Sequence, residues 1–108
     1  MKTIETATLE HWVKTGLKFV LVDTLPRQTF DEGHLPGAIN IVSDEILTRA
    51  SVEIPDRHVT VVVYCASAAC QRAGLSAERL KSLGYTDIHH YLAGKRGWVT
   101  SGHALERA

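Results

Sequence analysis

The amino-acid sequence predicts an α/β domain with a mainly parallel sheet. Two apolar runs, at residues 19–23 and 59–64, lack the alternation of a half-exposed strand and are typical of strands buried on both faces. Residues 70–83 place small apolar side chains at steps of three and four, which is the spacing of one helix face. Because segments of the two kinds alternate along the chain, we expect a parallel sheet with helical crossovers.

The first elements of this domain are a helix and a strand. Thr8 is placed to cap a helix over residues 9–15, and Gly16 is placed to end it. The apolar run at 19–23 then closes on a carboxylate, Asp23, and predicts the first buried strand.

A turn-rich segment, residues 33–37, separates this strand from the next. It leads into a short apolar run at 38–42, which we interpret as a second strand. Ser43 or Asp44 can then cap a helix that extends to about Ala50.

The second half of the chain carries the strongest strand, residues 59–64, rich in β-branched side chains. It ends at Cys65, and after a short loop a helix is expected over residues 70–83, with Gly84 as its stop. Its apolar stripe consists of Ala69, Ala73, Ala77, Leu80 and Leu83. A last strand at 88–91 and a short helix or turn at 94–98 complete the pattern.

Length and composition favour one ordinary domain spanning residues 1–108. Twelve basic and twelve acidic side chains give a formal charge of zero, which argues against a nucleic-acid partner. No apolar run is long enough to cross a bilayer and the N-terminus does not resemble a secretory signal, so we predict no membrane partner and a cytoplasmic protein. No zinc spacing, phosphate loop or dinucleotide motif is present, so neither a metal nor a cofactor is expected.

Cys65 is the residue best placed for chemistry. In open parallel sheets, functional sites lie at the carboxyl ends of the strands, where Cys65 is expected. Inward-facing loop amides and the positive end of the following helix would lower the pKa of its thiol and stabilise a thiolate or persulfide anion. The alternative is an inert cysteine buried at a strand end, which is common in proteins.

Three separate segments match one known family in the right order. The first runs from Val20-Leu21-Val22-Asp23 through Phe30 to Gly33-His34-Leu35-Pro36-Gly37-Ala38-Ile39-Asn40, and the second is Val61-Val62-Val63-Tyr64-Cys65. The third comprises Leu80, Leu83-Gly84-Tyr85, Ile88, Tyr91, Gly94 and Trp98. Together these motifs resemble the single-domain rhodanese-like sulfurtransferases.

The resemblance implies a five-stranded, mainly parallel sheet flanked by helices on both faces, with Cys65 as the nucleophile. The implied reaction moves a sulfane sulfur from thiosulfate, or from a small-molecule or protein persulfide, to a thiol or cyanide through a Cys65 persulfide. The substrate-binding residues would be Ala66, Ser67, Ala68, Ala69, Cys70 and Arg72. Within this set, no basic side chain lies between the two cysteines.

Other residues near the loop have more than one interpretation. Cys70 can resolve a Cys65 persulfide, which would release sulfide and leave a Cys65–Cys70 disulfide, or it can be a core residue on the first helical turn. Asp23 is expected to hydrogen-bond loop backbone near the site, and His34 to hold its turn through a ring nitrogen. Arg72 can contact a bound anion or form a surface ion pair.

Two other functions stay open. A phosphatase or arsenate reductase of the related fold would need an arginine where this chain has Gln71, so only Arg72, one position later, is left to hold phosphate oxygens. A non-catalytic sulfur-carrier or interaction module is the second alternative, and the presence of Cys65 argues against it. The sequence does not identify the physiological donor and acceptor or the oligomeric state.

Overall fold

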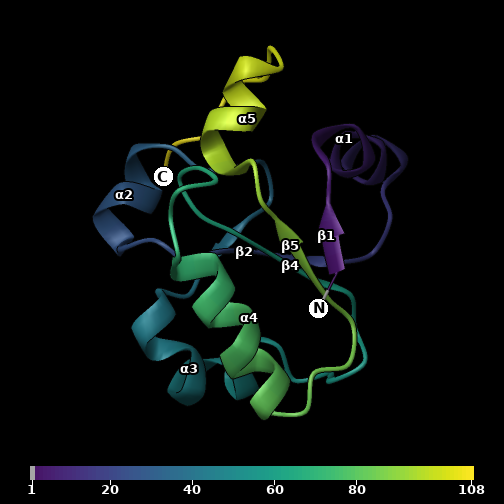
Figure 1. Cartoon of the computed structure of the whole chain (residues 1–108), viewed down its shortest axis with the longest axis vertical. Helices are drawn as coiled ribbons and strands as arrows, with labels where there is room; N and C mark the ends of the chain where they lie inside the picture. The colour runs from purple at the N-terminus through teal and green to yellow at the C-terminus, as the bar shows by residue number, and fades with distance from the viewer. Residues whose placement is uncertain (1) are drawn as a thin grey trace.

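A computed structural model of the chain describes residues 2–108. Five short strands alternate with helices along the chain, and Figure 1 shows the sheet lying between two groups of helices. The elements are β1 (Lys2–Ile4), α1 (Thr6–Thr15), β2 (Val20–Asp23), α2 (Arg27–Glu32), β3 (Ile39–Asn40), η1 (Ser43–Glu45), α3 (Ile46–Glu53), β4 (Val61–Tyr64), α4 (Arg72–Ser82), β5 (Ile88–Tyr91) and α5 (Gly94–Thr100).

The five strands form one sheet in the order β1-β5-β4-β2-β3, and every pair in it is parallel. The expected five-stranded parallel sheet is therefore confirmed. β4 lies at its centre and is paired with β2 on one side and β5 on the other. All four β4 side chains are fully buried, which explains why its sequence is continuously apolar rather than alternating.

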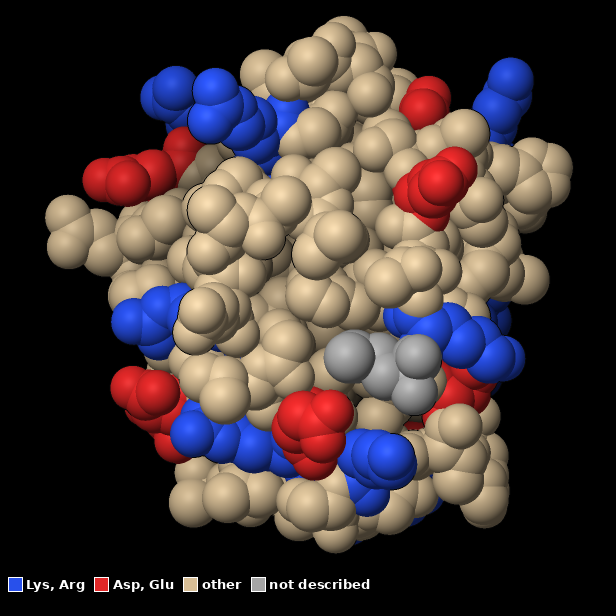
Figure 2. Space-filling model, in the orientation of Figure 1, with Lys and Arg blue, Asp and Glu red and all other residues tan. Residues whose placement is uncertain are grey.

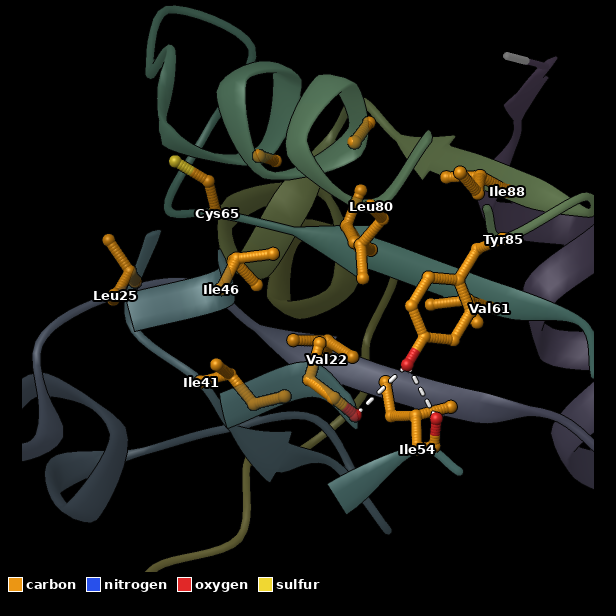
Figure 3. Packing of buried hydrophobic residues seen from close by; sticks show 14 residues of the cluster. Val22, Leu25, Ile41, Ile46, Ile54, Val61, Cys65, Leu80, Tyr85 and Ile88 are labelled. Atoms are coloured by element: carbon orange, nitrogen blue, oxygen red, sulfur yellow. Dashed lines mark hydrogen bonds between the residues drawn. The ribbon is translucent and has the colours of Figure 1, made fainter. Parts of the chain in front are cut away.

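Helices cover both faces of the sheet, and each face has its own core. Val61 and Val63 point to the face covered by α3 and α4, where they meet Ile46, Ala77 and Leu80 (Figure 3). The residues between and after them on the strand, Val62 and Tyr64, point to the opposite face. There they join a cluster that also contains Ile4, Leu9 from α1, Leu21, Leu35, Tyr91 and Trp98 from α5. The alternation follows from the two-residue repeat of a strand.

Two short elements were not predicted from the sequence. β1 has three residues and buries only Ile4, so it carries no periodic signal and is defined by its pairing with β5. α2 has six residues with Phe30 as its single buried side chain. Neither offers enough repeats for a pattern to be recognised.

The expected helix boundaries also need correction. α1 begins at Thr6, and Thr8 does not cap it, because Glu5 occupies the N-cap position without a side-chain hydrogen bond. Gly16 does end this helix, with a left-handed φ of 71°. α4 begins at Arg72 rather than at residue 70. Ala69 is therefore an exposed loop residue and not part of the buried stripe, whereas Ala73, Ala77 and Leu80 are buried as expected.

The surface mixes charges of both signs. Figure 2 shows basic and acidic side chains interspersed on the face viewed, in keeping with the zero formal charge. Within residues 2–108, no helix has the length and apolarity needed to span a membrane.

Candidate active site

The central strand delivers Cys65 to the carboxyl edge of the sheet. Cys65 is the first residue after β4, and the strands on either side, β2 and β5, run in the same direction. The sulfur is thus placed where parallel sheets normally carry their sites. Its side chain lies against the α3–α4 core, and the residue is only 2% exposed.

The loop after Cys65 is held by the start of α5. The Lys95 N–H donates to the Cys65 carbonyl and the Arg96 N–H donates to the Ala66 carbonyl, each at 3.0 Å. Gly94 makes this close approach possible. Its φ is 63°, and a Cβ at this position would lie 2.5 Å from the Cys65 carbonyl oxygen. A side chain there would push α5 away from the loop.

The loop amides are largely uncommitted. Over the described part of the chain, the N–H groups of Ala66, Ser67, Ala68 and Ala69 have no hydrogen-bond partner, whereas the Cys70 N–H donates to the Ser67 carbonyl at 3.1 Å. The carbonyls of Cys65 and Ala66 point to α5. The N–H groups of the same two planar peptides, which belong to Ala66 and Ser67, therefore point away from α5. These donors can therefore serve an anion.

The start of α4 adds to the positive character of this region. α4 begins two residues after Cys70, and the side chain of its N-cap residue, Gln71, makes no capping hydrogen bond. The first-turn amides of the helix thus keep their partial positive charge close to the loop. The loop amides and the helix end together form a candidate anion site beside Cys65.

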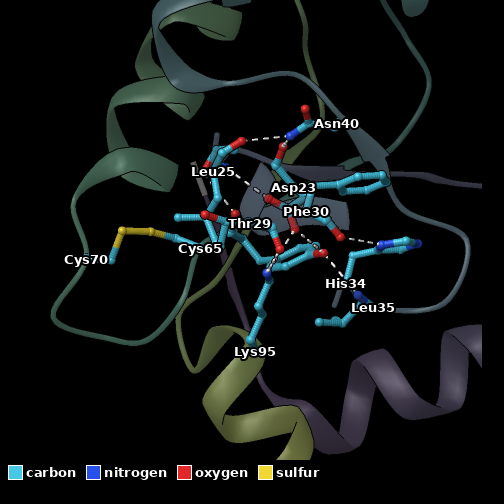
Figure 4. A network of polar contacts seen from close by, with 12 residues as sticks. Asp23, Leu25, Thr29, Phe30, His34, Leu35, Asn40, Cys65, Cys70 and Lys95 are labelled. Atoms are coloured by element: carbon cyan, nitrogen blue, oxygen red, sulfur yellow. Dashed lines mark hydrogen bonds and ion pairs between the residues drawn. A yellow bond between two sulfur atoms is a disulfide. The ribbon is translucent and has the colours of Figure 1, made fainter. Parts of the chain in front are cut away.

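Cys65 and Cys70 are joined by a disulfide, which closes the loop (Figure 4). Their Cα atoms are 6.2 Å apart, within the range that a disulfide requires. Cys70 is half-buried and lies before α4, so it is not the first-turn helical residue that one interpretation expected. The structure represents the oxidised form, and a reactive Cys65 thiolate exists only after this bond is reduced.

A buried polar network fixes the strand ends beneath the loop. Asp23, at the end of β2, is fully buried; its Oδ1 accepts from the Leu25 N–H at 2.9 Å and its Oδ2 from the Tyr64 hydroxyl at 2.8 Å. The same hydroxyl accepts from the Leu35 N–H at 3.0 Å. Tyr64, the residue before Cys65, thereby links the turn at 33–37 to Asp23.

Burial dominates the electrostatics of this network. Removal from water raises the pKa of Asp23 above its ordinary value, although the Leu25 N–H, the Tyr64 hydroxyl and the Lys95 ammonium act in the opposite direction. The pKa of Tyr64 is also raised, first by burial and then by the nearby Asp23 charge. Tyr64 therefore stays protonated and serves as a hydrogen-bond donor.

Lys95 completes the network and is not among the site residues predicted from the sequence. Its Nζ lies 3.8 Å from Asp23 Oδ2 and donates to the Thr29 carbonyl at 3.0 Å, with the side chain 13% exposed. A signal for it existed. The segment Gly94-Lys95-Arg96 follows β5, and the carboxyl ends of β5 and β4 lie side by side because the two strands are parallel neighbours. The basic side chains of this segment therefore lie at the same edge of the sheet as Cys65.

The other residues singled out in the sequence lie around the loop in different ways. Arg72 donates from its guanidinium to the Ser43 hydroxyl at 3.0 Å. His34 is buried, stacks on the Phe30 ring and shares a 2.8 Å hydrogen bond between its Nδ1 and the Phe30 carbonyl oxygen. Ser67 lies in the loop beside an open groove.

This groove runs between the loop and α5 and has a volume of about 530 Å³. Ser67, Ala68 and Ala69 line one side, and Arg96 and Thr100 belong to the other. Arg96 is exposed and forms no ion pair with any residue in 2–108. A free cation of α5 is thus present beside a loop that has no basic side chain of its own.

No metal centre is found in the described chain, where no group of three or more metal-ligating side chains comes together. The donors gathered at the carboxyl edge are N–H groups, a lysine and an arginine, which suit an anion and not a cation.

Solved structures share this architecture. A protein from Bacillus halodurans superposes with a TM-score of 0.90 at 22% identity, covering 98% of this chain and 77% of that protein. A human single-domain sulfurtransferase superposes with a TM-score of 0.82 at 23% identity, covering 95% of this chain and 99% of the human one. These likenesses establish a rhodanese-like fold.

Sequence relationships define the family. The sequence-family model of the rhodanese-like domain matches residues 6–101. Thiosulfate sulfurtransferase PspE of Escherichia coli (strain K12) is 32% identical over 81 residues, which cover 75% of this chain and 67% of that protein. The chain belongs to the rhodanese-like domain family, as its sequence motifs predicted.

Proposed function

We propose that the protein is a sulfurtransferase that carries sulfane sulfur as a persulfide on Cys65. The observation that carries the proposal is the position of Cys65 at the end of the central strand, followed by a loop in which the N–H groups of residues 66–69 have no hydrogen-bond partner among residues 2–108. Family membership and a related thiosulfate sulfurtransferase support transfer of sulfur in general. We expect it to act in the cytoplasm.

The first half-reaction requires the reduced form. The Cys65 thiolate attacks the outer sulfur of a donor such as thiosulfate, the bond between the two donor sulfurs breaks, and sulfite leaves with the bonding electron pair. The unpartnered loop amides would stabilise the negative charge of the bound donor and then of the persulfide. The donor can equally be a small-molecule or protein persulfide.

In the second half-reaction, a thiolate or cyanide attacks the outer sulfur of the persulfide, and Cys65 leaves as a thiolate. Either partner would bind in the groove beside the loop, which Ser67, Ala68 and Ala69 line. Arg96 supplies the positive charge that residues 66–69 lack, and so favours an anionic donor.

Thiocyanate formation from thiosulfate and cyanide tests the proposal, with protein that has been reduced beforehand. We expect turnover by the wild type, none by Cys65→Ser, and weakened thiosulfate use by Arg96→Ala. Lys81→Ala is the matched control, since Lys81 is an exposed cation at the far end of α4. Absence of turnover by reduced wild type with thiosulfate and with glutathione persulfide, or hydrolysis of an aryl phosphate instead, would reject the proposal.

A further inference from the structure

The disulfide between Cys65 and Cys70 indicates a second outcome for the bound sulfur. We propose that Cys70 discharges the Cys65 persulfide as hydrosulfide, so that the protein is also a dithiol-dependent persulfide reductase. This inference rests on the proposed function, because it needs the sulfur to be loaded on Cys65 first.

Cys70 is placed to reach Cys65 without a large rearrangement. The two sulfurs are bonded within the described fold, and the Cys70 N–H turns back to the Ser67 carbonyl in the same loop. Because α4 begins at Arg72, the helix does not hold Cys70 away from Cys65. The Cys70 thiol is five residues from the persulfide, in a loop that α5 holds at Cys65 and Ala66, so it competes at high effective concentration with thiols from solution.

Burial separates the two possible attacks. Cys65 is 2% exposed, so its Sγ, the inner sulfur of the persulfide, is shielded from solvent. An external acceptor is therefore directed to the outer sulfur, which leads to transfer. Cys70 is bonded to this Sγ in the oxidised form, so it can reach the inner sulfur from within the loop, and attack at this atom leads to release.

The release step is balanced in atoms and electrons. The Cys70 sulfur forms a bond to Cys65 Sγ, and the bond from Cys65 Sγ to the outer sulfur breaks. The outer sulfur leaves with that electron pair and the proton of the Cys70 thiol, as hydrosulfide. The sulfane sulfur is reduced, and the two cysteines are oxidised to the disulfide seen in the structure.

Turnover then requires a reductant of the dithiol class. One of its thiolates attacks the Cys65–Cys70 bond, and its second thiol completes the exchange, which restores both cysteines. The overall reaction converts a persulfide sulfur and a dithiol into hydrosulfide and an oxidised dithiol. In the absence of such a reductant, the oxidised loop holds Cys65 inactive.

A single-turnover experiment separates release from transfer. Wild type, Cys70→Ser, Cys70→Ala and Cys65→Ser are reduced, freed of reductant without oxygen, and mixed with thiosulfate in the absence of any thiol. Hydrosulfide is then measured with a sulfide electrode, and the intact mass of each chain is recorded.

We expect wild type to release about one hydrosulfide per chain and to end two hydrogens lighter than its reduced form, as a disulfide. Both Cys70 variants should retain one extra sulfur and release hydrosulfide only after dithiothreitol is added. Cys65→Ser should show neither event.

The outcomes keep the two proposals apart. A wild-type chain that keeps its extra sulfur and releases no hydrosulfide overturns the role of Cys70 and leaves sulfur transfer intact. Prompt hydrosulfide release by both Cys70 variants without a thiol would also overturn the role of Cys70. If no chain gains a sulfur from thiosulfate or from glutathione persulfide, the proposed function itself fails.

Discussion

The two edges of the sheet each carry an aspartate with several donors, yet the two carboxylates behave oppositely. Asp23, at the carboxyl edge, is fully buried, and burial raises its pKa. Asp87 lies at the amino edge directly before β5, with its side chain 34% exposed. The Thr60 hydroxyl at 2.7 Å, followed by the charge and hydrogen bond of His89, lowers the pKa of Asp87.

Solvent access therefore determines whether a hydrogen-bond network can lower the pKa of a carboxylate. At the amino edge, water stabilises the charge and the added donors stabilise it further. At the carboxyl edge, the donors offset only part of the loss of hydration. The buried network therefore has a structural task, which is to hold Tyr64 and hence the strand end that delivers Cys65.

Removing the buried carboxylate should have the largest effect. Asp23→Ala leaves the Tyr64 hydroxyl, the Leu25 N–H and the Lys95 ammonium without their partner, and we expect a loss of about 3–5 kcal/mol in unfolding free energy. Urea denaturation of both variants measures it. Asp87→Ala is the control, expected to lose under about 1 kcal/mol. Equal losses would show that burial does not distinguish the two edges.

Gly94→Ala should be the next most damaging change at the carboxyl edge. The new Cβ combines an unfavourable positive φ with a clash against the Cys65 carbonyl, for an expected loss of about 2–3 kcal/mol and displacement of the loop. Gly16→Ala is a matched control, because Gly16 also has a positive φ but no atom within 4 Å of the new Cβ. Thiocyanate formation should fall in the Gly94 variant alone, and an active Gly94→Ala protein would contradict the close packing.

Tyr64→Phe should have a smaller effect, since it deletes only the hydroxyl. The Leu35 N–H loses its acceptor and Asp23 loses one donor, which we expect to cost about 1–2 kcal/mol. Tyr91→Phe removes a hydroxyl that is paired, among residues 2–108, only with the partly buried Thr6 side chain, so denaturation should show a smaller loss for it. A larger loss of unfolding free energy for Tyr91→Phe than for Tyr64→Phe would show that the Asp23 network does not hold the end of β4 more firmly than the Thr6–Tyr91 hydrogen bond holds β5.

The smallest expected effect is the pH dependence of the two carboxylates, which should have opposite signs. Asp87 binds its proton less tightly when folded, so its contribution to stability is present above a pH of about 4 and is lost as the pH falls through its lowered folded pKa. Asp23 binds its proton more tightly when folded, so its contribution is complete below a pH of about 4 and is lost as the pH rises through its raised folded pKa.

Carbon-13 NMR titration of the two side-chain carboxyls measures these values directly. We expect the Asp23 midpoint above, and the Asp87 midpoint below, the value of an unfolded aspartate. Asp87→Asn should remove under about 1 kcal/mol of stability at neutral pH, and this difference should vanish on acidification. Coincident midpoints would contradict the comparison.

Patterns along the chain were enough to predict the sheet and the place of Cys65 in it. The β-branched run at 59–64 predicts a strand buried on both faces. The residue that follows such a strand lies at the carboxyl edge of a parallel sheet. These features depend on local patterns, which a single chain displays directly. The resemblance to the family's motifs added the prediction of five strands and of sulfur transfer.

The residues that surround this cysteine, in contrast, are set by the three-dimensional packing of distant segments. Lys95 and Arg96 meet the loop after a separation of some thirty residues, β1 exists only through its pairing with β5, and Asp23 owes its raised pKa to burial by distant segments. The bond between Cys65 and Cys70 depends on a loop that stops before α4 begins. Long-range packing and exclusion of water set these features, and neither leaves a periodic trace in the order of residues.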